Sequence, residues 1–251
     1  MATTSPGVTE ARPPLPAGSH VCWIVEDKAA YAAESASFLA EAGRAGECPA
    51  LLPHDLSHGG RLESAGMART LREQTARARA RGYRGVRLVA DMERLHRAEA
   101  ATREIVAYEA LLDRVADEIG ATIICAYPRW SFTSETLAGV LAVHSVLHGH
   151  DTEPRFRFVS SGTREWRLSG EVDITVGSLF EAAFAAAVRL GDCAVDLSAL
   201  RFIDVGGVRI IASAAEGETV RLRHAPRVLR RYWELGGFAR LAPGVRLITS
   251  A

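Results

Sequence analysis

The sequence lacks the features that mark several common classes of protein. Its 30 basic and 30 acidic residues cancel, so no net charge attracts the chain to nucleic acid or to an anionic membrane surface. No segment reaches the run of about 20 apolar residues that a bilayer-spanning helix needs. The start of the chain has no apolar stretch behind a basic one, which argues against secretion. We therefore expect a cytoplasmic protein with no nucleic-acid and no membrane partner.

Cysteine and lysine are scarce. The four cysteines are widely spaced and lie mostly in apolar segments, which suits buried thiols better than a disulfide framework or a zinc site. This distribution is consistent with a reducing cytoplasm. Lys28 is the only lysine, so arginine supplies nearly all of the positive charge.

A glycine-rich phosphate loop is also absent. Such a loop has the pattern G-x-x-x-x-G-K-[ST], in which backbone N–H groups surround the phosphates. Here the first apolar segment runs into EDKAAY, where Lys28 stands beside two acidic residues. Serines, histidines and aspartates are scattered without a nucleophile elbow such as G-x-S-x-G. We predict no catalytic residues, no cofactor and no enzymatic activity.

Apolar strand-like segments alternate with helix-like segments along residues 19–150. The preceding residues 1–18, rich in proline, glycine and small polar residues, are expected to form a disordered leader. Alternation of this kind predicts an α/β domain with a mainly parallel sheet between layers of helices. The predicted strands are HVCWIV, CPALLP, GVRLVADM and ATIICAYP.

A second, smaller α/β domain is predicted over residues 164–251. The polar segment 151–163 contains Pro154 and has no helical period, so we expect it to be a linker. After it, strand-like and helix-like segments alternate again. A chain of 251 residues is long enough for two domains of ordinary size.

The second domain resembles the STAS domain of bacterial anti-sigma-factor antagonists. The resemblance lies in the order LSGEVDI, helix, VDLSALRFIDVGGVRII, VRLRHA and LRRYWELGGF, from about Arg164 to the end of the chain. In phosphorylatable members an acidic residue is followed by one or two hydroxyl residues and a glycine at a helix start, where a phosphate is accommodated. Asp204 and Gly207 match this pattern, whereas Val205 and Gly206 stand at the hydroxyl positions.

This resemblance implies that residues 204–207 form a partner-binding turn without the usual phosphorylation site. A purely structural explanation is equally open, in which Asp204 caps the helix and the two glycines permit close packing. The partner that the resemblance implies is an anti-sigma factor or a related kinase-like regulator.

The first domain resembles the MEDS sensory domain of methanogen and methylotroph regulators, which is widespread in actinobacteria. The matching segments are HVCWIVED, FLAEAGRAGE, GYRGVRLVADM, AYEALLDRV and ICAYPRWSF. The layout is also similar to RecA-like and KaiC-like ATPase domains, which implies a degenerate three-layer version of that fold. The resemblance implies that the domain binds a small molecule or a protein.

Candidate residues for a sensory site are His20, Cys22 and Asp91. His20 and Cys22 occupy alternate positions of a predicted strand and could face a ligand, although a capping histidine and a buried thiol explain them equally well. Asp91 ends another strand, where a RecA-like enzyme keeps a magnesium-organising acid. Without a phosphate loop, an ordinary strand-end carboxylate is the better interpretation of Asp91.

His144 and His148 are weak metal candidates. They lie four residues apart on a helix predicted over residues 134–149, a spacing that can present two imidazoles to an ion. No cysteine or carboxylate cluster is evident in the sequence to complete a site, so partly exposed histidines at a helix end are favoured and no metal is predicted.

These observations favour a non-enzymatic signalling protein that alters transcription. A sensory domain would control a STAS module that engages a regulatory protein. Two alternatives remain: a nucleotide-binding or ATPase module of RecA type, and a scaffold whose STAS domain binds its partner constitutively.

Overall fold

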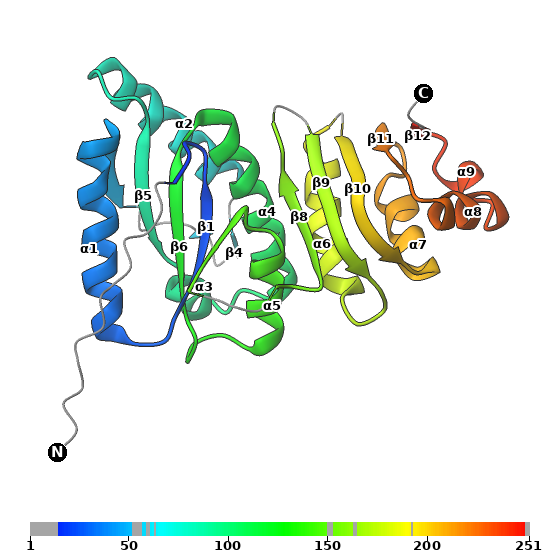
Figure 1. Cartoon of the computed structure of the whole chain (residues 1–251), viewed down its shortest axis with the longest axis horizontal. Helices are drawn as coiled ribbons and strands as arrows, with labels where there is room; N and C mark the ends of the chain where they lie inside the picture. The colour runs from blue at the N-terminus through cyan, green and yellow to red at the C-terminus, as the bar shows by residue number, and fades with distance from the viewer. Residues whose placement is uncertain are drawn as a thin grey trace.

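Two α/β domains lie side by side in the computed structural model (Figure 1). The structure describes residues 15–51, 57–58, 61–62, 64–149, 153–162, 165–191 and 193–248. Each domain is built on its own five-stranded sheet. The helices α4, α5 and α6 lie where the two domains meet. The predicted fold class is therefore confirmed.

The N-terminal sheet is wholly parallel, with the strand order β2-β5-β6-β1-β7. Helices connect most of its strands, as parallel pairing requires. The strands of this sheet are β1 (His20–Val25), β2 (Cys48–Leu51), β5 (Val86–Asp91), β6 (Thr122–Pro128) and β7 (Val146–His148). The helices are α1 (Lys28–Ala45), α2 (Ser64–Ala80), α3 (Glu93–Arg97), α4 (Thr102–Ile119) and α5 (Ser134–Ala142), and a separate antiparallel pair is formed by β3 (Ser57–His58) and β4 (Arg61–Leu62).

Strand β1 is buried on both faces, because helices cover both sides of the sheet. Val21, Trp23 and Val25 pack towards α1, whereas Cys22 and Ile24 pack into a second cluster with residues of α2, α4 and α5. This alternation places residue 20 on the α4 side of the sheet.

The C-terminal sheet is mixed, with the order β12-β11-β10-β9-β8. Only the pairing of β8 with β9 is antiparallel; the other described pairs are parallel. Its strands are β8 (Phe156–Ser160), β9 (Glu165–Val172), β10 (Cys193–Ile203), β11 (Val220–Arg223) and β12 (Val245–Ile248). Its helices are α6 (Gly177–Val188), α7 (Val205–Ala214), α8 (Arg227–Leu235) and α9 (Phe238–Leu241).

The expected linker over residues 151–163 contains a strand of the second sheet. Phe156 and Phe158 are buried and alternate with the half-buried Arg157, so this stretch has the period of two that marks a strand. Pro154 and the surrounding polar residues obscured that pattern. The prediction of a linker was therefore wrong for β8, and the second domain begins before residue 164.

The helix expected over residues 134–149 ends early, at Ala142. The chain then leaves the helix because the backbone N–H of His20 donates to Ser145 Oγ and that hydroxyl donates to the His20 carbonyl, at 3.0 and 3.1 Å. These bonds guide the next residues into β7, which pairs with β1. His144 and His148 therefore do not share a helix face, and that prediction was wrong.

The expected disordered leader, residues 1–18, lies largely outside the described residues. Its last part is described, and there Leu15 packs against the apolar cluster on the α1 side of the sheet. The backbone carbonyl of Pro16 accepts a hydrogen bond from the N–H of Ser19 at 3.2 Å. Residues 15–18 are therefore part of the folded domain.

The two domains share one apolar core. Val106 and Ala110 of α4, with Ala142 and Val143 at the end of α5, belong to the same buried cluster as the core of the C-terminal sheet. Gly139 of α5 permits this approach, because a Cβ at that position would lie 2.6 Å from Val106 Cγ2 and 3.1 Å from Leu179 Cδ2. The domains are thus packed against each other as closely as elements within one domain.

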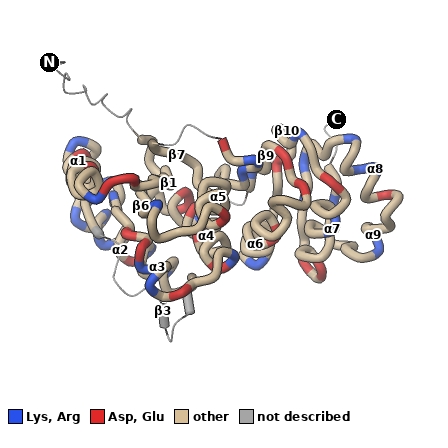
Figure 2. Tube along the Cα trace, turned by 90° about the horizontal axis from the view of Figure 1, so that it is seen from below, with Lys and Arg blue, Asp and Glu red and all other residues tan. Residues whose placement is uncertain are grey.

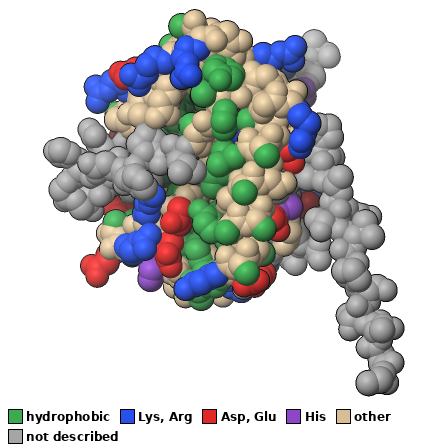
Figure 3. All heavy atoms as spheres, turned by 90° about the vertical axis from the view of Figure 1, so that its left-hand side faces the viewer, with side chains coloured by type: hydrophobic (Ala, Val, Ile, Leu, Met, Phe, Trp, Pro, Cys, Tyr) green, Lys and Arg blue, Asp and Glu red, His purple; other side chains and the backbone are tan. Residues whose placement is uncertain are grey.

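Charge is mixed over the chain. Figure 2 shows Lys and Arg interspersed with Asp and Glu along both domains. The exposed face of α1 is rich in alanine, visible as hydrophobic spheres in Figure 3. In the described part of the chain no helix has the length and apolar character to cross a membrane.

Candidate functional site

The turn that joins β10 to α7 presents an acidic cap beside an exposed apolar side chain. Asp204 is the N-cap of α7, with φ −85° and ψ 175°, and its Oδ1 accepts a hydrogen bond from the N–H of Gly207 at 2.7 Å. Val205, the first residue of the helix, is 56% exposed. The structural explanation offered from the sequence therefore applies, because Asp204 caps the helix. The turn is also accessible, and its role in partner binding stays a prediction.

The two glycines of the turn differ in the space available for a side chain. A Cβ at Gly207 would lie 2.7 Å from Ile203 Cγ1 and 2.9 Å from Val172 Cγ1, so close packing excludes any side chain there. A Cβ at Gly206 would meet only the capping carboxylate, at 3.1 Å from Asp204 Oδ1. The backbone shape of the turn is therefore fixed at Gly207, while Val205 and Gly206 occupy the accessible side.

Exposed apolar side chains lie beside this turn, which is joined to the end of β9 by the hydrogen bond from the N–H of Asp204 to the Val172 carbonyl at 3.0 Å. The register between β9 and β10 shifts between Leu200 and Phe202, and Phe202 is left 45% exposed although it lies in a strand. Ile174, which follows β9 at the same edge of the sheet, is 89% exposed. We call Ile174, Phe202 and Val205 the edge patch. An apolar surface of this kind on a domain edge is typical of a protein-binding site.

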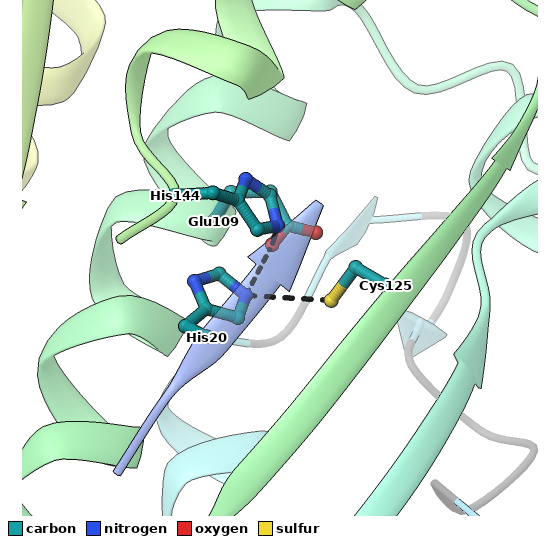
Figure 4. Close-up of side chains that lie close together, drawn as sticks. All are labelled: His20, Glu109, Cys125 and His144. Atoms are coloured by element: carbon teal, nitrogen blue, oxygen red, sulfur yellow. Dashed lines mark hydrogen bonds and ion pairs between the residues drawn. The ribbon is translucent and has the colours of Figure 1, made fainter. Parts of the chain in front are cut away.

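A second candidate site is buried in the N-terminal domain. His20, Glu109, Cys125 and His144 point towards one another (Figure 4), and their donor atoms all lie within 4.8 Å of each other. They come from the start of β1, the middle of α4, the centre of β6 and the segment after α5. All four side chains are fully buried. We call them the buried cluster.

Glu109 Oε2 lies at the centre of the buried cluster. His20 Nε2 is 3.0 Å and His144 Nε2 is 3.3 Å from this oxygen. The Sγ of Cys125 is 3.3 Å from His20 Nε2. The other carboxylate oxygen, Oε1, accepts a hydrogen bond from the hydroxyl of Tyr127 at 2.6 Å.

The outer nitrogens of both imidazoles face acceptors. His20 Nδ1 lies 3.3 Å from Asp113 Oδ1, and His144 Nδ1 lies 2.6 Å from the backbone carbonyl of Val140. A histidine whose Nδ1 donates to such an acceptor directs its Nε2 inward. The two rings also stack, with centroids 3.9 Å apart.

The buried carboxylate and the two imidazoles shift one another's ionisation. Burial would lower the pKa of His20, but the adjacent carboxylates of Asp113 and Glu109 raise it to about 9. Burial would raise the pKa of Glu109, but its contacts with His144 and His20 hold it well below the usual range for a glutamate. Burial and the neighbouring His20 lower the pKa of His144. Such opposed shifts within one enclosed cluster are typical of a functional site.

The structure separates the residues that the sequence proposed for a sensory site. His20 belongs to the buried cluster. Cys22 is in register with Cys125 on the neighbouring strand but is not one of the four grouped residues. Asp91 lies on the α1 side of the sheet, where its Oδ1 accepts a hydrogen bond from the N–H of Glu93 at 3.1 Å. The three residues therefore do not form one site.

Two members of the buried cluster, Glu109 and Cys125, were not predicted from the sequence. Glu109 and the nearby Asp113 lie on the buried face of α4, where Ile105 and Leu112 also point inward. Acidic residues within such a helical stripe were the available signal. The statement that no cysteine or carboxylate completes a site around His144 was therefore wrong, because folding brings Glu109 and Cys125 to it. His148 lies elsewhere, with its Nε2 2.8 Å from Glu34 Oε2.

A pocket of about 270 Å³ opens at the carboxyl ends of β1, β5 and β6. Its lining includes Lys28, Tyr31, Asp91 and Trp130. The loop from β1 to α1 consists of two residues, and the second, Asp27, caps the helix by accepting from the N–H of Ala29 at 3.1 Å. A carboxylate therefore already occupies the helix start where a phosphate loop would hold its anion.

Comparison with protein families found one match in each of the two domains. Residues 50–145 match the model described as MEDS, the methanogen/methylotroph, DcmR sensory domain. Residues 162–248 match the model described as the Mlab, STAS domain. No curated protein matches the chain. The chain is thus a fusion of an N-terminal MEDS domain with a C-terminal STAS domain.

Proposed function

We propose that this chain is a regulatory protein whose MEDS domain controls the binding of its STAS domain to an anti-sigma factor or a related kinase-like regulator. The protein would act in the cytoplasm, without catalytic activity of its own, and would alter transcription through that partner. The observation that carries the proposal is the edge patch, which places exposed apolar side chains beside the capped turn at Asp204.

Regulation by phosphorylation of the turn itself is not part of this proposal. Val205 and Gly206 have no hydroxyl group to accept a phosphoryl group. Gly207 is enclosed by Ile203 and Val172, so even a serine placed there would meet buried side chains. A response to any signal would then have to enter elsewhere, and the MEDS domain is the natural input.

The shared core supports such a route between the domains. Val106 and Ala110 of α4 pack in the same cluster as Phe180 of α6. The N–H of Ser160 in β8 donates to Asp113 Oδ2 at 2.6 Å, and Asp113 also contacts His20. A change at the buried cluster therefore has direct contacts through which to alter the STAS sheet.

The rival ATPase function has less support. The two-residue loop after β1 leaves no glycine-rich segment, and Asp27 would repel a phosphate at the start of α1. Lys28, the only lysine, lies over the ring of Trp130 at 5.5 Å. We therefore expect calorimetry with ATP and magnesium to give no binding isotherm. A clear isotherm that Lys28→Ala abolishes would favour the rival function.

The partner proposal is tested with the full-length protein and a panel of purified anti-sigma factors from the source organism. Val205→Arg is the sharpest variant, because it places a charge in the edge patch and leaves the Asp204 cap in place. Leu190→Arg is its control, since Leu190 is 48% exposed but follows α6 at the opposite edge of the sheet. We expect Val205→Arg to weaken binding more than tenfold, which corresponds to about 1.4 kcal/mol, and Leu190→Arg to leave it unchanged.

Two results would count against the proposal. Equal binding by a folded Val205→Arg variant would show that the edge patch is not the contact surface. Failure of the whole panel to bind the wild-type protein would reject this class of partner. The constitutive scaffold predicts that binding is the same whatever variant is introduced into the buried cluster, provided that the protein stays folded.

A further inference from the structure

We propose that His20, Glu109, Cys125 and His144 bind one zinc ion inside the MEDS domain. This site goes beyond the proposed function, since neither partner binding nor the STAS turn requires a metal. The geometry of the buried cluster, its buried polar atoms without hydrogen bonds and the chemistry of its donor atoms lead to this conclusion.

The four donor atoms are spaced as a single small cation requires. Zinc bonds of about 2.0 to 2.1 Å to nitrogen and about 2.3 Å to sulfur place neighbouring donors of a tetrahedron roughly 3.3 to 3.8 Å apart. His144 Nε2 lies 3.3 Å from Glu109 Oε2, and His20 Nε2 lies 3.3 Å from Cys125 Sγ. All pairs lie within 4.8 Å, so small side-chain adjustments would give each donor a bond to one ion.

Hydrogen bonding leaves an electron lone pair of His144 facing the carboxylate. The short 2.6 Å contact between His144 Nδ1 and the Val140 carbonyl requires a proton on Nδ1. With its proton on Nδ1, the neutral ring carries a lone pair on Nε2 directed at Glu109 Oε2, 3.3 Å away. Two acceptors that face each other in a buried site repel, and a cation between them removes that repulsion.

Two atoms at the centre of the cluster lack hydrogen bonds. Among the residues that the structure describes, none forms a hydrogen bond with Glu109 Oε2 or with His144 Nε2, although both atoms are fully buried. An ion pair with a protonated His20 would neutralise Glu109 but would leave His144 Nε2 without a partner. A zinc ion would bond both atoms at once.

The charges of the ligands suit a divalent cation. A carboxylate from Glu109 and a thiolate from Cys125 carry two negative charges, which Zn²⁺ neutralises in these apolar surroundings. Asp113 beside His20 Nδ1 supplies the carboxylate–histidine contact that commonly orients zinc ligands. Two imidazoles and a thiolate favour zinc over magnesium or calcium, which prefer oxygen donors.

The site would be closed, with four protein ligands and no side chain open to solvent. A zinc ion held in this way has no position for a substrate, so its role is structural or sensory and not catalytic. Its ligands come from β1, α4, β6 and the segment before β7, so the ion would join the sheet to the helix that packs against the STAS domain.

The test measures zinc in the full-length protein by mass spectrometry of the metal, after refolding with zinc and removal of loosely bound ions. We expect one zinc ion per chain. Cobalt in place of zinc should give the visible bands of a tetrahedral site and the charge-transfer band of a thiolate ligand. Cys125→Ser should lose that band and reduce metal content at least tenfold. Cys22→Ser is the matched control and should keep both, because Cys22 lies in register with Cys125 but outside the cluster.

A second pair of variants keeps the test decisive if Cys125→Ser fails to fold. His144→Gln should lose the metal, whereas His148→Gln, four residues away and paired with Glu34, should retain it. The proposal is overturned if the wild-type protein binds substoichiometric zinc under these conditions, if its cobalt form shows no thiolate band, or if Cys22→Ser loses metal as Cys125→Ser does. None of these results bears on partner binding at the edge patch, which is measured separately.

Discussion

The edge patch of the STAS domain and the buried cluster of the MEDS domain are opposites in chemistry and in exposure. The patch places apolar side chains in solvent, with Val205 56% exposed, whereas the cluster places four polar side chains where solvent does not reach them. Each therefore departs from the general rule that apolar groups are buried and polar groups exposed. Such departures cost stability, and proteins retain them mainly at sites with a function.

The difference in exposure assigns different tasks to the two sites. A protein partner can reach the edge patch directly, but it cannot touch the buried cluster. A change at the cluster can influence the surface only through packing. The contacts for this exist, because Glu109 lies on α4 between Val106 and Ala110, both of which are part of the shared core. Arg157 of β8 also donates to the carbonyl of His144, at 2.7 Å.

The largest effect is expected from removal of the central carboxylate of the buried cluster. Glu109→Ala removes the buried carboxylate that faces two imidazoles and that accepts the hydrogen bond of the Tyr127 hydroxyl, so we expect a loss of about 3 to 5 kcal/mol in the free energy of unfolding. Glu118→Ala on the same helix is the control. Its ion pair with Arg72 is exposed, and its removal should cost about 0 to 1 kcal/mol. Urea denaturation measures both, and equal effects would show that the cluster is no more important than a surface pair.

A smaller effect is expected at the interface between the domains. Gly139→Ala inserts a methyl group 2.6 Å from Val106 Cγ2, and we expect overpacking to cost about 1 to 3 kcal/mol. Gly43→Ala in α1 is the opposite case, because no described atom lies within 4 Å of the added carbon. The better helix propensity of alanine should stabilise that variant by up to about 1 kcal/mol. Thermal unfolding of both variants checks the signs; a stabilised Gly139→Ala variant would mean that the domains are loosely packed.

The smallest effect is expected at the turn itself. Asp204→Ala removes the cap of α7 and should cost about 1 kcal/mol. Asp204→Asn should retain nearly all of the stability, since asparagine caps helices about as well as aspartate. Chemical denaturation compares the two. If Asn and Ala destabilise the protein equally, the charge of Asp204 matters to the fold more than its hydrogen bond does.

Much of the fold was predictable because parallel strands and their covering helices have strong local signals. HVCWIV and ATIICAYP are short apolar runs next to predicted helices, and both form inner strands of the N-terminal sheet. The elements that were missed depend on distant partners. β7 forms because Ser145 bonds to the backbone of His20, and β8 forms because it pairs with β9. A local pattern does not contain those contacts.

The two sites also differ in how far they could be predicted from local sequence. The turn at residues 204–207 is continuous in sequence, so its cap and its missing hydroxyl could be read directly. The buried cluster is assembled from four segments between residues 20 and 144. Histidines were noticed in two of those segments, but sequence spacing could not bring Glu109 and Cys125 to them. The packing of α4 against the sheet brings Glu109, and the pairing of β1 with β6 brings Cys125.

Hydrogen–deuterium exchange of the full-length protein tests most directly whether the two domains act as one unit. Glu109→Gln has nearly the shape of the parent residue and alters only the buried cluster, with Glu118→Gln as its surface control. The shared core predicts faster exchange of backbone amides in β8 and α6 of the STAS domain in the Glu109→Gln variant, and no change there in the control. Faster exchange confined to residues 20–149 would contradict the account, because the buried cluster would then have no route to the edge patch.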